Sequence, residues 1–190
     1  MPSPPHYREQ VRQKIVQSAA QLFNRHGFAA VSIDDVMAGA GLTRGGFYSY
    51  FQSKSELYAE AINHFVNGKL EGAAAVDKAA DRATQIVRDY LSLQPSEDVD
   101  ARSPLIGLSN DLSRTDRSVR VAQEAALRMM IETFEHGVTH SAQPARQRAL
   151  ALTSLCVGGM VLARAIEDRS LANEIREASM AIALTLGRWT

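Results

Sequence analysis

The chain has 190 residues and a mass of 20.8 kDa, which is enough to bury a hydrophobic core without disulfides or metals. Hydrophobic residues make up 45% and charged residues 22%, so a mini-protein, wholesale disorder and a fibrous repeat are excluded. Basic and acidic residues both number 21, so the total charge gives no sign of nucleic-acid or membrane binding. Any such sign must come from a local segment.

The sequence shows no feature of an exported or membrane-inserted protein. Cys156 is the single cysteine and has apolar neighbours, which is typical of a buried thiol in a reducing compartment. The first residues lead into charged side chains from Arg8 onward, unlike a secretory signal. The longest uncharged run, between Arg148 and Arg164, is about fifteen residues, and a bilayer needs roughly 20. We therefore expect a cytoplasmic protein that does not enter a membrane.

Apolar residues recur at spacings of three and four along almost the whole chain, and no segment alternates like a strand. We therefore predict an all-α fold of about nine helices. The first spans residues 8–26, and Gly27 ends it. Ser32 caps a helix of two turns that ends near Ala40, and Gly41 then turns the chain with a positive φ.

Two further helices follow this turn closely. Thr43 is expected to cap a short helix that runs to about Tyr48. Ser53 and Glu56 form a predicted capping box for a longer helix through about Leu70.

The rest of the chain is predicted to hold a bend, a loop and five more helices. The bend lies at 72–76 and the loop at 95–102. Helices are expected over 83–91, 104–113, from Asp116 or Ser118 to about 134, over 145–166 and over 171–186. The expected apolar stripes of two of them are Val121, Ala125, Met129 and Phe134, and Leu171, Ile175, Ala178, Ile182 and Leu186.

The succession of a helix, a sharp glycine turn and a short helix in residues 33–48 is typical of a helix-turn-helix, whose second helix enters a DNA major groove. The local charge agrees with this interpretation. Residues 1–54 contain six basic and three acidic side chains, a net charge of +3 in a neutral chain.

The segment from Ser32 to Leu57, SIDDVMAGAGLTRGGFYSYFQSKSEL, resembles the DNA-binding segment of tetracycline-repressor (TetR) type transcriptional regulators. The residues that carry the resemblance are Ala40-Gly-Leu-Thr43, Phe47-Tyr48, Phe51 and Ser53-Lys54. It implies a helix-turn-helix DNA-binding domain over 1–54 and a helical ligand-binding and dimerisation domain over 55–190.

The resemblance also implies which residues contact DNA, and their chemistry suits the task. Ser32 can present a hydroxyl and an amide to a phosphate, and Arg44 can read guanine. The glycines allow close approach of the backbone, and the tyrosines and lysine can reach phosphates. The candidate DNA-binding residues are Ser32, Thr43, Arg44, Gly45, Gly46, Tyr48, Ser49, Tyr50 and Lys54.

Other residues of the segment have simpler explanations. Tyr50 stands where many family members carry His, and it can still donate to a phosphate. Asp34 and Asp35 are unusual on a surface that faces DNA, and we interpret them as partners of the helix dipole. The core of the small domain is expected to be Val36, Leu42, Phe47 and Phe51, with Ser53 as a cap.

By resemblance, the C-terminal domain encloses a cavity for a small-molecule effector, with the helix over 53–70 as the lever to the DNA-binding domain. Adaptable apolar pockets favour methionine and aromatic residues, and no buried charge is evident from sequence, so we expect an uncharged or hydrophobic ligand. The candidate lining residues are Phe65, Tyr90, Leu105, Leu108, Met129, Met130 and Phe134.

A homodimer through the last two helices is expected as well. One helix-turn-helix buries too little surface for useful specificity, and two-fold pairing lets two copies address half-sites about 34–36 Å apart on a palindrome. The family resemblance points to the same helices. Their small and apolar residues include Ala149, Ala151, Leu152, Leu155, Gly158, Gly159, Val161 and Leu162.

Several weaker patterns lead to no expected cofactor or metal. The glycines from Gly39 to Gly46 fit neither a dinucleotide fingerprint nor a phosphate-binding loop. Glu132, His136 and His140 could share a helix face, but the nearby glycine and proline favour a solvated helix end. A helical enzyme and a DNA-binding architectural protein without an effector remain the alternatives, and we expect no catalytic residues.

Overall fold

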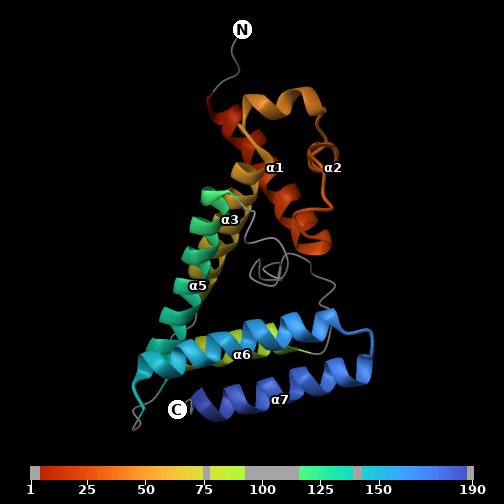
Figure 1. Cartoon of the computed structure of the whole chain (residues 1–190). Helices are drawn as coiled ribbons and strands as arrows, with labels where there is room; N and C mark the ends of the chain where they lie inside the picture. The colour runs from red at the N-terminus through yellow and green to blue at the C-terminus, as the bar shows by residue number, and fades with distance from the viewer. Residues whose placement is uncertain (1–4, 75–77, 93–115, 139–142, 188–190) are drawn as a thin grey trace. The chain divides into compact units, whose positions relative to one another are not determined.

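The computed structural model describes residues 5–74, 78–92, 116–138 and 143–187. In these ranges the chain is helical and has no strand, which confirms the predicted all-α class. The predicted loop at 95–102 and helix at 104–113 lie outside the described residues. The elements are α1 (Pro5–His26), α2 (Ile33–Gly39), the 3-10 helix η1 (Arg44–Ser49), α3 (Lys54–Ala74), α4 (Ala79–Leu91), α5 (Arg117–Gly137), α6 (Ala145–Ala165) and α7 (Arg169–Gly187) (Figure 1).

The chain divides into two compact units. The first takes in residues up to Asn67 together with the start of α5 as far as Glu124, and the second takes in the rest of the described chain. The helices α3 and α5 each contribute to both units. The predicted functional domains, 1–54 and 55–190, stay a prediction.

Unit 1 is built around a small apolar core that α1, α2, η1 and the start of α3 share. The fully buried side chains include Ile15, Phe47 and Leu57, which come from three different elements. The rings of Phe47 and Phe51 stack with centroids 5.8 Å apart. The Ser18 hydroxyl donates to the Val36 carbonyl and ties α1 to α2. The residues predicted as core are buried, except that Leu42 is half-buried.

The ends of α2 form as the sequence predicts. Ser32 is the N-cap of a capping box with Asp35, and Ala40 is the C-cap. Gly41 has a φ of +72°, and the Gly41 and Leu42 amides donate to the carbonyls of Ala38 and Met37. This is the Schellman arrangement, which satisfies the last carbonyls of a helix. Both ends of this seven-residue helix are therefore closed by local hydrogen bonds.

The start of α3 differs slightly from the predicted capping box. The Ser53 hydroxyl accepts from the Glu56 amide as expected, but the Glu56 carboxylate accepts from the Gln52 amide instead of the Ser53 amide. Helix α3 continues to Ala74, so the predicted bend at 72–76 is wrong for its first residues.

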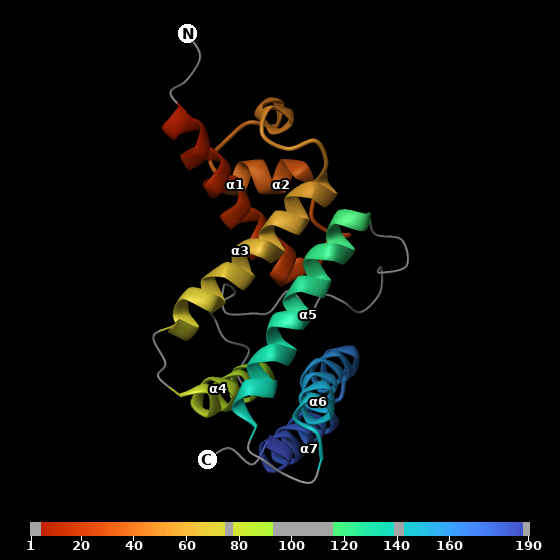
Figure 2. The same cartoon turned by 90° about the vertical axis from the view of Figure 1, so that its left-hand side faces the viewer.

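In unit 2, α6 and α7 lie side by side and antiparallel (Figures 1 and 2). Gly159 of α6 makes the approach close, because a Cβ there would come within 2.5 Å of the Ser179 hydroxyl and 3.4 Å of Leu91. The guanidinium of Arg148, 3% exposed, donates to the carbonyls of Leu186 and Gly187 at the end of α7. A cation suits the negative end of a helix dipole.

Arg148 corrects the expectation that the chain has no buried charge. It also bears on α6, which is the one described helix that could cross a membrane by its length and composition. This helix packs along α7 and carries a buried, hydrogen-bonded arginine, as a core helix of a folded unit does.

The predicted stripe of α5 is partly wrong. Phe134 is buried as predicted, but Met129 is half-buried and Val121 and Ala125 are exposed; the other buried apolar side chains are Val119, Ala122, Ala126 and Met130. On α7 the buried positions are Ala172, Ala183 and Gly187, and the predicted stripe, on a helix of the expected dimer interface, is half-buried or exposed, with Leu171 44% and Ile182 56% exposed. Small residues of α7 pack against neighbouring helices, so its larger apolar residues stay at the surface of the protomer.

Candidate nucleic-acid interface

The helix η1 combines one buried anchor with an exposed polar face. The Phe47 side chain is 0% exposed and the adjacent Tyr48 is 66% exposed. Arg44, Gly45 and Ser49 are exposed as well, and Tyr50 is half-buried. The structure therefore gathers most of the predicted DNA-binding residues on a single short element that the core holds in place.

Thr43 stands at the N-cap of η1, but its side chain makes no capping hydrogen bond. The predicted position is correct and the predicted capping bond is absent. Thr43 is exposed, as are the two residues that follow it. Nothing within 4 Å would meet a Cβ at Gly45, so this end of η1 lies open.

Arg8 of α1 holds the other end of η1, and Arg12 of α1 holds the residues just after it. The basic character of α1 was their only signal in the sequence. The Arg8 guanidinium donates to the Ser49 carbonyl at 2.6 Å and lies 5.9 Å from the centre of the Tyr50 ring. Arg12 lies 4.6 Å from the centre of the Phe51 ring and forms an ion pair with Glu60 of α3, which raises the pKa of the Arg12 guanidinium.

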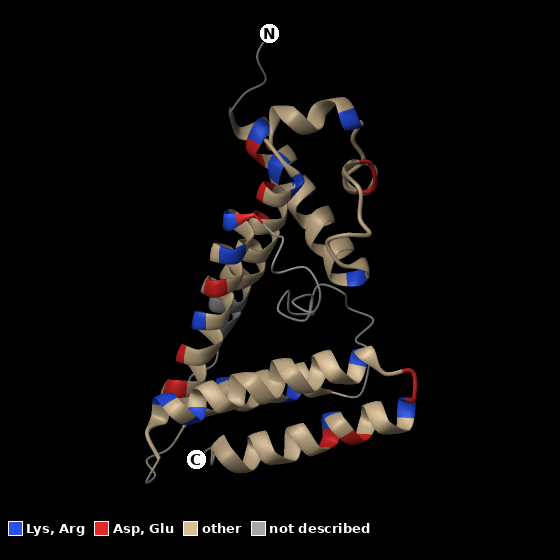
Figure 3. Ribbon diagram, viewed as in Figure 1, with Lys and Arg blue, Asp and Glu red and all other residues tan. Residues whose placement is uncertain are grey.

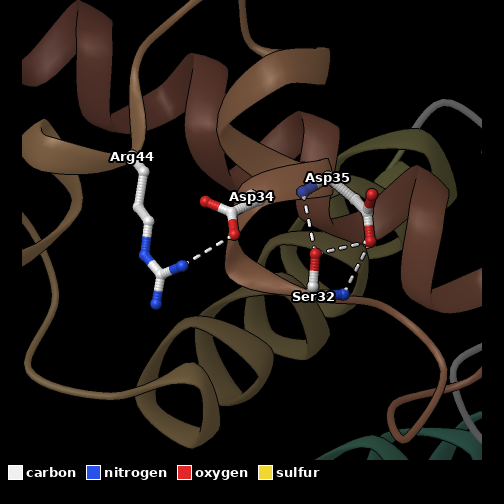
Figure 4. A network of polar contacts seen from close by, with 4 residues as sticks. All are labelled: Ser32, Asp34, Asp35 and Arg44. Atoms are coloured by element: carbon white, nitrogen blue, oxygen red, sulfur yellow. Dashed lines mark hydrogen bonds and ion pairs between the residues drawn. The ribbon is translucent and has the colours of Figure 1, made fainter.

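Ser32 is committed to its own helix (Figure 4). Its amide and its hydroxyl both donate to the Asp35 carboxylate, at 2.8 and 2.6 Å, and the hydroxyl accepts from the Asp35 amide. These bonds hold the pKa of the Asp35 carboxyl below its usual value of 3.8. Since both hydrogens of Ser32 are already donated, a contact from this residue to a phosphate requires the cap to rearrange.

Asp34 has a different partner from Asp35. Its Oδ2 accepts a hydrogen bond from the Nη1 of Arg44 at 2.8 Å, which joins the first turn of α2 to the first residue of η1 (Figure 4). The two side chains are 53% and 66% exposed. From the sequence, Asp34 was interpreted only as a partner of the helix dipole, and this ion pair was missed. The two residues are ten positions apart, and nothing in that spacing indicates that α2 and η1 bring their side chains together.

Lys54 packs on an aromatic cluster as well as lying near the candidate interface. Its Nζ lies 4.4 Å from the centre of the Phe28 ring. Burial of part of the side chain lowers the pKa of Lys54, and the Asp35 carboxylate opposes this effect. The lysine therefore has a packing role in addition to the predicted phosphate contact.

The charges of unit 1 are separated by element. Figure 3 shows lysines and arginines along α1 and at the start of η1, and carboxylates at the start of α2. The carboxylates of α2 are Asp34 and Asp35, each of which is paired as described above. The helix-turn-helix itself carries Arg44 and two aspartates that are already engaged, so the basic excess of residues 1–54 comes mainly from α1.

The predicted effector residues lie in several places. Phe65 of α3 and Met129 of α5 are half-buried, while Tyr90, Met130 and Phe134 are buried in unit 2. Leu105 and Leu108 lie outside the described residues. His136 binds the Glu132 carbonyl, His140 is outside the described ranges, and those ranges contain no group of three or more metal-ligating side chains.

Residues 15–61 match the sequence profile of the bacterial regulatory proteins of the tetR family. This match covers α2, η1 and the turn between them. Residues 15–61 therefore form a helix-turn-helix segment of the TetR family. Among curated relatives, the HTH-type transcriptional regulator YfiR of Bacillus subtilis is 32% identical over 75 residues, 40% of this chain and 35% of YfiR. The matched segments span 19–35% of the lengths of these first relatives.

Solved structures share the fold over most of the chain. The reduced form of Escherichia coli NemR is 20% identical, with a TM-score of 0.73 over 93% of this chain and 97% of NemR. SmeT in its complex with triclosan is 22% identical, with a TM-score of 0.64 over 93% of this chain and 90% of SmeT. The TetR-family fold thus extends beyond the segment that the sequence comparison matches.

Proposed function

We propose that this chain is a cytoplasmic transcriptional repressor that binds a palindromic operator in double-stranded DNA as a homodimer and leaves it when a small molecule binds. The observation that carries the proposal is η1, which is anchored by Phe47 and exposes Arg44, Tyr48 and Ser49 inside the segment that matches the TetR family. The chain acts by binding, without catalysis or a cofactor.

The candidate DNA contacts have separate tasks. Arg44 reads a base edge, since arginine can donate two parallel hydrogen bonds to guanine O6 and N7. Tyr48, Ser49, Tyr50 and Lys54 contact phosphates and fix the position of η1. Ser32 and Thr43 lie beside them, and Gly45 and Gly46 admit the backbone to the groove. A few side chains thus read bases, and the phosphate contacts supply most of the affinity for DNA.

The exposed apolar side chains of α6 and α7 support the dimer. Leu150, Leu162, Leu171 and Ile182 are between 44% and 56% exposed. Gly158 has open space where its Cβ would lie, so a partner helix could approach there. Such a surface on one pair of helices is typical of an oligomer interface.

The effector is proposed to be uncharged or hydrophobic and to bind among the apolar residues of the C-terminal part. Tyr90, Met130 and Phe134 are buried side chains of suitable chemistry in unit 2. The similar SmeT structure is a complex with a small molecule, triclosan, which supports the presence of an effector site. Binding shifts the protein toward one state only through a difference in affinity between the two states, and α3 is the proposed lever.

The first experiment selects bound duplexes from a random-sequence DNA library with the full chain. Enrichment of one palindromic sequence supports the proposal, and enrichment of none contradicts it. Light scattering at micromolar concentration should give twice the mass of the chain, and a monomer would contradict the dimer. Leu162→Glu with Ile182→Glu should yield monomers with much weaker binding to the palindrome. Val121→Glu, at an apolar side chain of α5 that is 58% exposed, serves as the control.

The effector is tested by release. A screen of apolar compounds should find one that displaces the protein from the selected duplex. Met129→Arg, at a half-buried position among the candidate lining residues, should abolish that response in a protein that still folds and binds DNA. An unchanged response would contradict the proposed ligand site.

A further inference from the structure

We propose that Asp34 determines how selectively the helix-turn-helix reads DNA, by holding the guanidinium of Arg44 in one orientation. Asp34 is then a positioning residue that acts through Arg44. The inference rests on the proposed function, in which Arg44 reads a base. It also explains why an acidic residue lies on a surface that is proposed to face DNA, where a carboxylate would otherwise be unfavourable.

The geometry of the pair leaves the reading edge of Arg44 open. Asp34 engages Nη1 alone, at 2.8 Å. A guanidinium is a planar fork with five N–H donors, so the edge formed by Nε and Nη2 keeps two parallel donors. Two parallel donors are what guanine O6 and N7 accept. Figure 4 shows the carboxylate on one side of the guanidinium, with the other side chain nitrogens directed away from it.

The element that carries Asp34 is rigid enough to orient a partner. The capping box closes the N-terminus of α2 and the Schellman arrangement closes its C-terminus. The Ser18 hydroxyl fixes the Val36 carbonyl in the middle of the helix. Asp35 provides the cap, so Asp34 is not needed for it. The two adjacent carboxylates therefore have separate roles.

Stability does not account for the pair. Both side chains are more than half exposed, and exposed ion pairs contribute little to folding because water screens them. Arg44 has few other constraints, since Thr43 makes no capping bond and the space at Gly45 is open. Without Asp34 the guanidinium would be free to adopt many orientations.

The electrostatics predict opposite effects on two kinds of DNA. A carboxylate on this surface repels the phosphates of every duplex and neutralises Arg44, so it weakens non-specific binding. An oriented Arg44 strengthens binding only where a guanine lies opposite. Removing Asp34 should therefore raise affinity for unrelated DNA and lower the ratio of specific to non-specific affinity.

The test compares variants of the full chain on two duplexes: the sequence that wild type selects from a random library, and a scrambled duplex of equal composition. Fluorescence anisotropy gives Kd at several KCl concentrations. For Asp34→Asn we expect the affinity ratio to fall at least about five-fold. The slope of log K against log salt on the scrambled duplex should steepen by about 1, because Arg44 becomes free to contact a phosphate.

Two controls separate positioning from charge. Glu9→Gln removes one exposed carboxylate of α1 in the same unit, so it should strengthen binding to both duplexes alike and leave the ratio unchanged. In an Arg44→Ala background, Asp34→Asn should change the ratio less than about two-fold, since a residue that acts through Arg44 has no effect without it. Asp34→Glu, which keeps the carboxylate, should retain the ratio.

Two results would overturn the inference and leave the proposed function intact. One is a ratio of specific to non-specific affinity for Asp34→Asn that stays within about two-fold of wild type. The other is a fall in this ratio that is as large in the Arg44→Ala background as in wild type. Failure of wild type to select any sequence would instead contradict the proposed function, and this inference with it. If Asp34→Asn does not fold, Asp34→Ser takes its place, because serine is favourable at the start of a helix.

Discussion

Gly41 and Gly159, one in each unit, are required for opposite reasons. Gly41, between α2 and η1, has a φ of +72°, and nothing within 4 Å would meet its Cβ. Gly159, inside α6, has no unusual φ, and a Cβ there would come within 2.5 Å of Ser179. The first glycine is required by the backbone and the second by packing, as is Gly39 of α2, where a Cβ would come within 2.5 Å of the Ser18 hydroxyl. Local rules thus form the turn of the helix-turn-helix, whereas contacts between distant segments set how closely the helices pack.

The largest expected effect concerns Phe47, the buried anchor of the helix-turn-helix. Phe47→Ala should lower the free energy of unfolding by roughly 3–5 kcal/mol, because it empties a fully buried site in the core of unit 1. The exposed neighbour provides the matched control. Tyr48→Ala should change stability by less than about 0.5 kcal/mol and weaken DNA binding. Denaturant unfolding followed by circular dichroism measures both, and equal losses would contradict the assignment of anchor and contact.

Two adjacent glycines of α6 test how closely this helix packs against its neighbours. Gly159→Ala should destabilise the protein by about 1–3 kcal/mol, because Ser179 must move to admit the new methyl group. Gly158→Ala should stabilise it by about 0.5–1 kcal/mol, since the methyl group meets nothing in the protomer and alanine favours a helix. Unfolding is compared at one protein concentration. Ser179→Gly should rescue Gly159→Ala, and no rescue would count against this contact.

A smaller effect concerns the cap of α2. Because the pKa of Asp35 is lower in the folded protein than its usual 3.8, its carboxylate contributes stability above that value and loses it as the pH falls through the folded pKa. Asp35→Asn should therefore have a lower Tm than wild type at pH 7, and the difference should vanish in acid below pH 3.8. Ser32→Ala should behave in the same way, and a difference independent of pH would argue against the cap.

No effect at all is expected at Cys156. Its side chain is 0% exposed, and burial raises the pKa of its thiol to about 12. Since the thiolate is the reactive form, a disulfide reagent at pH 8 should leave the native protein unmodified and label it once after unfolding in guanidinium. Rapid labelling of the native protein would show that α6 opens readily.

The sequence predicted the helix-turn-helix well because its signals are short-range. Ser32 and Gly41 act within a few residues of their own position, and the structure confirms the cap and the positive φ. The burial of Phe47, predicted from its apolar spacing within the same short segment, is confirmed as well. The family match over 15–61 agrees. The DNA contacts and effector residues stay predictions, since neither DNA nor ligand is present.

Longer-range relationships could not be predicted. Several side-chain contacts depend on where another element lies in space. They are the ion pair of Arg44 with Asp34, the contacts of Arg8 and Arg12 with residues near the end of η1, and the burial of Arg148 against α7. The wrong positions in the predicted stripe of α5 have the same origin. Apolar spacing finds a helix, but several faces of this helix carry apolar residues, and packing decides which one is buried.

The division of labour within η1 has an evolutionary consequence. Phe47 alone in this helix is buried, and the fold of α2 depends on backbone hydrogen bonds, Ser32 and Asp35. Thr43, Gly45 and Ser49 are exposed and take no part in those bonds through their side chains. Mutations at these three positions should therefore be nearly neutral for folding, so that a duplicated gene could drift to a new operator without first becoming unstable.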